Sequence, residues 1–514
     1  MQGWITISKM APSLFLLDSA LVVLGLYILR QYLINKNRHP VPPGPRGLPF
    51  VGNVLDMPTS YEWLTISEWT KRWGDIIHVN VLGKHFVFLH SAEDAVALLD
   101  KRSTNYSDRP TLIMAGELVG WAPVLGLTQY NDRFRESRRF FSRIIGTKSA
   151  LRPFHELIET ETHKFLRRLI YTPENVHDHI RKTASGIIMK ITYGYSVSEG
   201  KDPYVDMVDK AMENFSVTTT PGAFLVDVLP ILRYVPSWVP GANFQKLAAA
   251  WRAEAVEMSE TPFAMVKQQM REGTALPSYT KNLLETETLT PEKEDNIKWS
   301  AASMYGGGAD TTVSAIYGFF LAMTMYPEIN QKAKEEIDRV VGKDRLPTFA
   351  DRENLPYVEA VVNEVLRLST VVPLGIPHRA SQDDIYKGYF IPKDTIVIAN
   401  IWALLRDPET YPDPLVFNPD RYLSPNPDRN PRDFIFGFGR RICPGLNLAD
   451  TSVFFACAKV LATFDISKAV ENGVIVEPSG EYTAGTISHP KEFKCSIKPR
   501  TAKASSLILA EFEQ

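Results

Sequence analysis

The chain has 514 residues, of which 44% are apolar and 23% charged, so it can bury a large core. Its 57 Lys and Arg residues against 59 Asp and Glu residues leave a formal net charge of −2, which gives no reason to expect a nucleic-acid partner. Three cysteines cannot form a disulfide framework in a chain of this size, and we expect a reducing compartment.

The first predicted element is a transmembrane helix over residues 14–34. It contains thirteen Leu, Ile, Val or Phe residues, which contribute roughly −4 to −8 kcal/mol to insertion against about +3 kcal/mol for Asp18. More positive charges follow the segment than precede it, so the rest of the chain should be cytosolic. A cleaved signal peptide is the alternative, but no small-residue cleavage site follows. We predict a lumenal N-terminus at 1–13, a membrane anchor at 14–34, a basic and proline-rich hinge at 35–52, and one domain at 53–514.

After the hinge, the hydrophobic periodicity predicts hairpins and helices in turn. β-Branched and aromatic residues predict a hairpin at 76–89 around Gly83-Lys84, and a second one at 385–400 around Pro392-Lys393-Asp394. Helical spacing of apolar residues predicts helices at 92–101, 133–145, 175–193, 297–326, 357–368 and 446–464. These elements predict a mainly α domain with small peripheral sheets.

One short run near the start of the predicted helix 175–193, His177-Asp178-His179, has residue types that bind metals. No further ligand cluster accompanies it, so we interpret it as a solvated helix start.

The long predicted helix 297–326 contains three consecutive glycines at 306–308, each of which costs about 0.8–1 kcal/mol relative to alanine in a helix interior. They are followed by Ala309-Asp310-Thr311-Thr312, which places an acid and a hydroxyl where the helix is easiest to distort. The alternative is a kinked core helix in which a threonine bonds back to a carbonyl. A phosphate-binding loop is disfavoured, because no Gly-Lys-Ser/Thr sequence and no preceding strand signal are present.

Within the predicted helix 357–368, Glu364 and Arg367 stand three residues apart and share one face, so they can pair. Taken alone, this spacing is typical of a solvated surface pair.

Cys443 lies in the passage Phe436-Gly437-Phe438-Gly439-Arg440-Arg441-Ile442-Cys443-Pro444-Gly445, just ahead of the predicted helix 446–464. Backbone N–H groups and the positive end of that helix should favour its thiolate, so we predict an iron ligand. Gly439 and Gly445 allow a tight loop close to a flat cofactor, and Arg441 offers a positive charge to a carboxylate. The alternative is a buried cysteine in a turn.

The pattern Phe-x-x-Gly-x-Arg-x-Cys-x-Gly at 436–445 resembles the haem-binding signature of the cytochrome P450 superfamily, and residues 307–312 resemble its oxygen-activation motif. The resemblance covers about residues 42–497 and implies the cytochrome P450 haem-domain fold. It implies haem b with Cys443 as the axial ligand and Phe436, Gly439, Arg441 and Gly445 around the cofactor. In the same family, Asp310 would shuttle protons and Thr311 would steady bound dioxygen.

The resemblance extends to residues outside these two motifs. Arg421, in Phe417-Asn418-Pro419-Asp420-Arg421-Tyr422, joins Glu364 and Arg367 in what resembles a buried structural triad that supports folding of the haem pocket. The expected partners of the haem propionates are His378, in Pro377-His378-Arg379, together with Arg138 and Arg109. Arg138 belongs to a motif in which Phe134 replaces the family tryptophan and cannot donate its hydrogen bond. For Arg109, an ordinary surface arginine is the alternative.

The resemblance implies a haem-thiolate monooxygenase in the endoplasmic reticulum membrane, with its catalytic domain facing the cytosol. The chain is most similar to fungal microsomal enzymes of secondary metabolism, those like O-methylsterigmatocystin oxidoreductase. The substrate would be a lipophilic terpenoid, polyketide or indole-type molecule, oxidised with O2. Electrons would come from NADPH through a separate NADPH-cytochrome P450 reductase, docked at a basic surface that includes Arg432 and Arg440. Largely apolar pocket walls are expected at 111–128, 215–226, 304–305, 371–374 and 483–487.

Two other functions stay open from the sequence. A haem-thiolate isomerase or dehydratase would need no reductase, but it would be expected to dispense with the acid and alcohol pair at 310–311. A noncatalytic haem-binding sensor would need neither a reductase nor the acid and alcohol pair. Oxygen uptake that depends on NADPH and a reductase would separate a monooxygenase from both.

Overall fold

The computed structural model describes residues 39–510 together with Gly25, so the predicted lumenal and transmembrane segments lie outside the described residues apart from that glycine. The described part of the predicted hinge lies against strands of two different sheets. The N–H of His78 donates to the carbonyl of Pro43 at 2.8 Å, and the N–H of Phe390 donates to that of Pro40 at 2.8 Å. A side chain at Gly44 would place its Cβ 1.9 Å from the carbonyl oxygen of His78, so only glycine fits this close approach.

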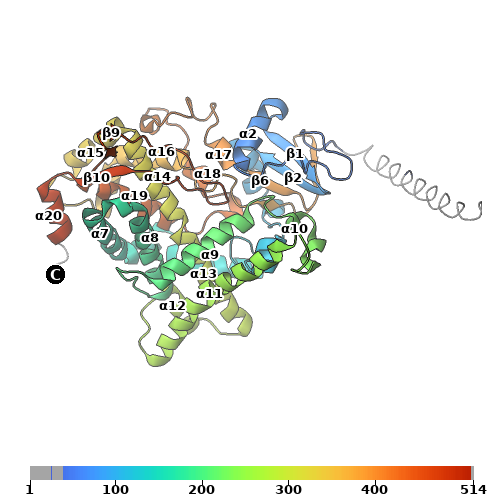
Figure 1. Ribbon diagram of the computed structural model, residues 1–514, viewed down its shortest axis with the longest axis horizontal. Helices are drawn as coiled ribbons and strands as arrows, with labels where there is room; N and C mark the ends of the chain where they lie inside the picture. The colour runs from blue at the N-terminus through green and yellow to red at the C-terminus, as the bar shows by residue number, and fades with distance from the viewer. Residues whose placement is uncertain (1–24, 26–38, 511–514) are drawn as a thin grey trace, which may run out of the picture.

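Helices make up most of the described chain (Figure 1). The longer ones are α2 (Glu62–Trp73), α5 (Asp132–Ile145), α7 (His155–Tyr171), α8 (Val176–Tyr193), α9 (Pro203–Thr219), α11 (Asn243–Glu272), α12 (Tyr279–Thr286), α13 (Pro291–Ala309), α14 (Thr311–Met325), α15 (Pro327–Val340), α16 (Pro356–Leu368), α19 (Leu446–Thr463) and α20 (Ala502–Ala510). Short helices are α3 (Ala92–Ala95), η1 (Val96–Lys101), α4 (Ser103–Tyr106), η2 (Ile113–Val119), α6 (Lys148–Leu151), η3 (Arg152–Phe154), η4 (Pro173–Asn175), α10 (Leu225–Val228), η5 (Pro230–Tyr234), η6 (Phe349–Asn354), α17 (Ile401–Leu404), η7 (Pro419–Tyr422), α18 (Arg432–Ile435) and η8 (Gly439–Arg441). All six predicted helical segments are confirmed, with the predicted helix 297–326 divided into α13 and α14 and the predicted helix 92–101 divided into α3 and η1.

Helix boundaries follow local signals in the sequence. The side chains of Asn131 and Thr290 accept the N–H groups of Phe134 and Lys293 at the starts of α5 and α13. Proline occupies the first position of α9, α13, α15 and α16, where its missing N–H has no intrahelical partner to lose. At the end of α8, Gly194 has φ +72°, a left-handed conformation that glycine adopts readily.

One four-stranded sheet lies at an end of the molecule with α2, and α7, α15, α19 and α20 lie toward the other end (Figure 1). The strand order of the four-stranded sheet is β1 (Ile76–Val81), β2 (Lys84–Leu89), β6 (Ile396–Ala399) and β3 (His378–Arg379). Antiparallel pairing of β1 with β2 confirms the first predicted hairpin, whose Leu82 and Gly83 both have positive φ, as a two-residue hairpin turn requires. The two-stranded sheets pair β4 (Asp384–Tyr386) with β5 (Tyr389–Ile391), β7 (Phe464–Lys468) with β10 (Cys495–Pro499), and β8 (Val470–Glu471) with β9 (Val474–Ile475).

The prediction of a second hairpin around Pro392-Lys393-Asp394 is wrong. β4 and β5 turn instead at Lys387-Gly388, where φ is +47° and +80°. β6 leaves that hairpin and pairs parallel to β2, with Phe86 opposite Ile396 and Leu89 opposite Ala399. β2, one of the two partners of β6, lies about 300 positions away in the sequence, so no local turn signal specifies this pairing.

The core is formed around two apolar helices, α14 and α19. Every residue of α14 from Thr312 to Thr324 is buried, and the helix packs against α8, α16 and α19. Among the helices that the structure describes, α19 alone is long and apolar enough to cross a membrane, but 78% of its residues are buried inside the protein. Its apolar character is therefore explained by the core.

A buried ion-pair network joins α16 to the segment that precedes the Cys443 loop. Glu364 and Arg367 are fully buried, so they are not the solvated pair that their spacing alone suggested. The guanidinium of Arg367 donates from Nε and Nη2 to the two carboxylate oxygens of Glu364, both at 2.8 Å. The carboxylate also accepts from Arg421 Nε at 3.2 Å, from Tyr422 Oη at 3.0 Å and from the N–H of Asn418 at 2.8 Å.

The same arginine binds the backbone directly. Arg367 Nη1 donates to the carbonyls of Leu405 and Pro414 at 2.8 and 2.6 Å, and Nη2 donates to that of Val416 at 3.1 Å. The network thereby fixes residues 405–422 against α16.

We expect Arg367→Ala to lower the free energy of unfolding by about 3–5 kcal/mol, because it leaves the buried Glu364 carboxylate without its bidentate partner. Urea denaturation of the full-length protein in detergent, followed by tryptophan fluorescence, measures this loss. Lys71→Ala is the control, since Lys71 pairs with Glu68 on the surface of α2 and its loss should cost less than about 0.5 kcal/mol. Equal shifts in the two variants would contradict a structural role for the network.

Candidate active site

Cys443 lies in a tight loop that joins α18 to α19. The loop contains η8, and its glycines Gly437 and Gly439 have φ values of +78° and +50°, which side chains rarely adopt. The N–H of Cys443 donates to the carbonyl of Phe436 at 2.8 Å and closes the loop. Gly445 is the residue before α19, so the predicted helix follows the cysteine directly.

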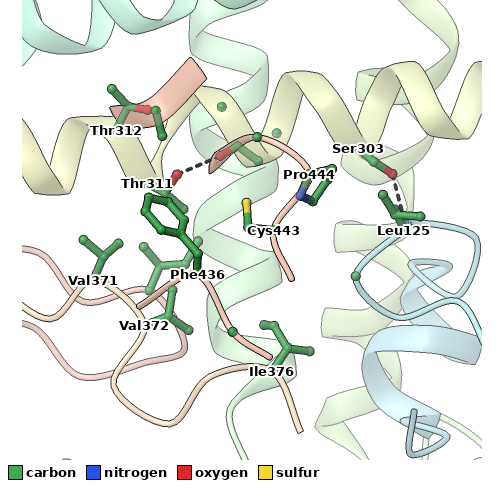
Figure 2. A pocket seen from close by; sticks show the side chains of 18 of the residues that line it. Leu125, Ser303, Thr311, Thr312, Val371, Val372, Ile376, Phe436, Cys443 and Pro444 are labelled. Atoms are coloured by element: carbon green, nitrogen blue, oxygen red, sulfur yellow. Dashed lines mark hydrogen bonds between the residues drawn. The ribbon is translucent and has the colours of Figure 1, made fainter. Parts of the chain in front are cut away.

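The sulfur of Cys443 faces an internal cavity, where Figure 2 shows it between Phe436 and Pro444 and across from Thr311. Burial raises the pKa of its thiol, while hydrogen bonds from the N–H groups of Gly445 and Leu446 and the positive charge of Arg138 lower it. The donors predicted at the helix start are therefore present and favour the thiolate, but burial outweighs them. A coordinated metal ion would supply the missing stabilisation.

Gly439 and Gly445 serve the loop in different ways. A Cβ at Gly439 would lie 2.6 Å from the carbonyl oxygen of Leu99, so this glycine permits close packing of the loop on η1 and does not line the cavity. Gly445 does line the cavity, and a Cβ there would lie 3.8 Å from the sulfur of Cys443.

Arg441 is buried beside the cysteine and keeps one nitrogen without a partner. Its Nε donates to the carbonyl of Ser107 at 2.6 Å and its Nη2 to that of Thr128 at 2.9 Å, but its Nη1 has no hydrogen-bond partner. The guanidinium carbon lies 3.9 Å from the ring centre of Phe134. The residue that replaces the family tryptophan thus covers the Arg441 cation with its ring instead of donating a hydrogen bond. Burial lowers the pKa of Arg441 to about 10, so it remains charged at neutral pH.

The structure brings the other predicted propionate partners to the same cavity. Arg109 is buried, not a surface residue, and donates to the carbonyls of Gly126, Ile376 and Pro377. His378, on β3, has its Nδ1 2.6 Å from the carbonyl oxygen of Tyr106. Burial and the charge of Arg441 lower the pKa of Arg109, and burial together with the charge of Arg109 lowers that of His378.

Arg138, on α5, completes this set of basic residues. Its Nη1 donates to the carbonyl of Ile442 at 2.6 Å, one residue before the cysteine, and its side chain lines the cavity. Arg379, next to His378, does not line the cavity and pairs instead with Asp108 and Asp394.

These residues fit the haem that the resemblance implies. Four basic side chains and a cysteine sulfur line one cavity, and no Glu side chain and only one Asp, Asp450, lines it among the described residues. Asp450 is already paired with Arg352 and Arg432. The uncompensated positive charge and the orphaned nitrogen of Arg441 would be satisfied by two propionates, and the sulfur is suited to bind iron.

The helix opposite Cys443 is interrupted at Asp310, between α13 and α14. A Cβ at Gly306 would lie 2.7 Å from the sulfur of Met212, and a Cβ at Gly308 would lie 2.8 Å from the side chain of Ile188. A Cβ at Gly307 would contact nothing within 4 Å, and this residue lines the cavity. Two glycines therefore allow neighbouring side chains to approach the helix, and one leaves space in the cavity.

The acid and the hydroxyl at this interruption lie in different surroundings. Thr311 lines the cavity, and its hydroxyl donates to the carbonyl of Gly307 at 2.8 Å, the back-bond that we considered as an alternative (Figure 2). Asp310 does not line the cavity; its Oδ1 lies 3.1 Å from Nε2 of His489. The structure therefore places only the hydroxyl on the side of Cys443.

The cavity has a volume of about 380 Å³ and largely apolar walls. Of the predicted wall residues, Trp121, Phe215, Met304, Val371, Leu374 and Ile487 line it. Leu112, Ile113, Met114, Leu118 and Phe224 belong instead to the hydrophobic core around it. The sequence analysis did not predict the walls from α8 and α11 or the Met212 part of α9, such as Ile188, Met212 and Met258. The glycines at 306 and 308, which make room for them, were the available signal.

Arg432 is not available to dock a partner protein, contrary to the prediction. Its side chain is 13% exposed and pairs with Asp450 at 2.6 Å and with Glu359 at 3.0 Å. Arg440 is exposed, and its Nη2 donates to the hydroxyl of Thr104 at 3.0 Å.

Comparison with known proteins identifies relatives over nearly the whole chain. The profile of the family described as Cytochrome P450 matches residues 42–496. Cytochrome P450 monooxygenase 208 of Postia placenta is 51% identical over 98% of this chain and 99% of its own length. Cytochrome P450 monooxygenase claR of Ampulloclitocybe clavipes is 46% identical over 96% of this chain and 92% of its own, and cytochrome P450 monooxygenase ppsD of Aspergillus oryzae is 41% identical over 97% and 96%.

We expect Gly439→Ala to reduce cofactor content several-fold, because the left-handed φ costs about 1–2 kcal/mol and the new methyl group collides with the carbonyl of Leu99. The ratio of Soret to protein absorbance in purified protein measures the content. Gly437→Ala is the matched control, since it has a similar φ cost but no atom within 3.8 Å of its Cβ. Equal loss in both variants would show that the close packing on Leu99 does not matter.

Proposed function

Since the chain belongs to the cytochrome P450 family and is a cytochrome P450 monooxygenase, we propose that it oxidises a lipophilic small molecule in fungal secondary metabolism, using O2 and electrons from NADPH. One observation supports this proposal above the others. A cysteine sulfur, four basic side chains and the hydroxyl of Thr311 line one cavity whose remaining walls are mostly apolar.

The family implies a haem-thiolate cofactor, and the residues present would hold it. Cys443 would ligate the iron, and Arg109, Arg138, Arg441 and His378 would bind the propionates. When bound, the haem supplies the activation of dioxygen. The protein supplies the rest: apolar walls that position the substrate and exclude water, and a hydroxyl at Thr311 that presents a hydrogen-bonding oxygen to the cavity.

The substrate class follows from the walls of the cavity. Val371 and Val372 line it near Thr311 (Figure 2), and the side chains from α8, α9 and α11 include Ile188, Met212 and Met258. Such walls hold a guest by burial of apolar surface, and the flexible methionines can adapt to an irregular shape. A terpenoid, a polyketide or an indole-type molecule has this character, and similarity to fungal monooxygenases favours secondary metabolism.

Electron supply and location are part of the same proposal. A separate NADPH-cytochrome P450 reductase would deliver the electrons, with the exposed Arg440 near its docking surface. The apolar segment at 14–34 would anchor the protein in the endoplasmic reticulum membrane, with the domain at 53–514 in the cytosol.

The carbon monoxide difference spectrum of the reduced full-length protein tests the central claim. We expect the thiolate-type Soret band in the wild type and its loss in Cys443→Ala, because alanine offers no ligand. Cys457→Ala is the control, since Cys457 is buried in α19 away from the cavity and the band should remain. A well-folded, haem-loaded wild type without the band would overturn the proposal.

Oxygen uptake separates the proposal from the isomerase, dehydratase and sensor alternatives. With reductase and NADPH, a monooxygenase consumes oxygen in step with product, whereas the alternatives consume none.

We expect Thr311→Ala to uncouple the enzyme, so that NADPH is consumed at a comparable rate while peroxide rises several-fold at the expense of product, because the cavity loses its hydroxyl opposite Cys443. Parallel assays of NADPH, peroxide and product measure the ratio. Thr311→Ser keeps the hydroxyl and should restore most of the coupling. Unchanged coupling in Thr311→Ala would remove this residue from the mechanism.

A further inference from the structure

A cluster of charged and titratable side chains lies on the side of Asp310 that faces away from the cavity. It contains Asp310 at the helix interruption, His489 from the loop before β10, His177 and Arg181 from α8, and Asp209 from α9. Segments that are far apart in the sequence thus supply one polar site next to an otherwise apolar core helix.

The contact between Asp310 and His489 is the centre of this cluster. Nε2 of His489 lies 3.1 Å from Oδ1 of Asp310, and the two side chains are 18% and 14% exposed. Nδ1 of His489 is buried without a hydrogen-bond partner, so the contact with Asp310 is what orients the ring. The pair is shielded enough for its charges to interact and is still open to solvent at its edge.

The backbone around His489 is fixed independently of that pair. The N–H of Ser488 donates to the carbonyl of Val371 at 2.8 Å, and the hydroxyl of Ser314 on α14 donates to the carbonyl of Ser488 at 2.6 Å. The N–H of His489 itself donates to the hydroxyl of Thr483 at 3.0 Å. Because these bonds do not use the imidazole, the ring can be replaced without releasing the loop.

The other members of the cluster are coupled to this pair. Burial, together with the charges of Arg181 and His489, lowers the pKa of His177 to about 4, against the effect of Asp178 and Asp310. Burial, with smaller contributions from Asp310, Asp206 and Asp178, raises the pKa of Asp209 to about 6, although Arg181 lies 3.3 Å away and opposes the rise. The run at 177–179, which we interpreted as a solvated helix start, therefore contributes His177 to a half-buried polar cluster.

We propose that His489 is a positioning and proton-relay residue for Asp310, which holds the carboxylate on the solvent side of the helix interruption and supplies it with protons. The proposal rests on the proposed role of Asp310 as a proton shuttle. The structure assigns the two functions of the interruption to adjacent residues: Asp310 receives protons outside the cavity, and Thr311 presents a hydroxyl inside it.

The proton balance is simple. Each hydroxylation consumes one dioxygen, two electrons from NADPH and two protons, and gives product and water. The proton on Nε2 of a protonated His489 moves to Oδ1 of Asp310, which leaves a neutral imidazole that keeps the proton on Nδ1. Asp310 gives up this proton to the reduction of dioxygen and returns to the carboxylate. Nε2 regains a proton from solvent, so both the imidazolium and the carboxylate are restored after each transfer.

A substrate-free assay tests the proposal with the full-length haem protein, reductase and NADPH. Dioxygen is reduced either to peroxide, with two electrons and two protons, or to water, with four of each. We expect His489→Phe to raise the peroxide share of consumed oxygen several-fold, because the proton supply fails. His155→Phe is the matched control, since His155 stacks on Phe349 at 3.8 Å outside the cluster and the new ring can keep that contact.

A rescue variant separates a relay from a merely structural role. His489→Lys places another proton donor beside Asp310, so it should keep the low peroxide share that His489→Phe loses. A peroxide share in His489→Lys as high as that of His489→Phe would overturn the proposal.

A double-mutant cycle on thermal unfolding gives a readout that does not depend on activity. If His489 and Asp310 interact, the shift of the unfolding midpoint in the double variant His489→Phe/Asp310→Asn is smaller than the sum of the single shifts. Additive shifts overturn the proposal.

The peroxide assay distinguishes the two roles. If Asp310→Asn leaves the peroxide share unchanged, the proposed role of Asp310 fails. If Asp310→Asn raises the peroxide share and His489→Phe does not, only the role of His489 fails.

Discussion

The position of the Cys443 loop depends on the hydrogen bonds and ion pairs that surround the buried carboxylate of Glu364. A fully buried charge is tolerated only when partners surround it, and Glu364 obtains them from Arg367 in its own helix and from Asn418, Arg421 and Tyr422 in a segment without long helices. Arg367 in turn binds the carbonyls of Leu405, Pro414 and Val416. These bonds fix residues 405–422 against α16, and this irregular stretch precedes α18 and Cys443 in the chain.

In the cavity that Cys443 lines, unlike around Glu364, the charged side chains are not balanced by an equal number of opposite charges. There the positive charges of Arg109 and Arg441 are buried and that of Arg138 is half-buried, without an equal number of acids, and burial with mutual repulsion lowers the pKa of Arg109 and His378. Backbone carbonyls and the ring of Phe134 satisfy most of these groups but not their net charge. A ligand of opposite charge stabilises an excess of buried charge of one sign. The haem that the family implies would supply it with its propionates, and its iron would bind the sulfur.

The elements that could be predicted from the sequence are those specified by neighbouring residues. Helical periodicity, N-caps and prolines lie within each helix, and all six predicted helical segments are present. The second hairpin was misplaced because both Lys387-Gly388 and Pro392-Lys393-Asp394 are turn signals, and only the distant pairing of β6 with β2 decides between them. Arg109 has no neighbours that reveal its burial, and the pairing of Asp310 with His489, 179 positions away, leaves no local pattern.

The interruption of the core helix at Asp310 allows adjacent residues to present polar groups to different sides of the helix. In an unbroken helix, side chains of consecutive residues point about 100° apart, and the backbone N–H groups are hydrogen-bonded within the helix. A polar route from one side of such a helix to the other would therefore need polar side chains at several neighbouring positions. The break at Asp310 removes that requirement over two residues: the hydroxyl of Thr311 faces the cavity, while the carboxylate of Asp310 faces His489 and the solvent side. The apolar faces of α13 and α14 stay intact on either side of it. The helix therefore keeps its apolar faces and presents polar groups to both of its sides at one point, which is where the proposed proton route would cross it.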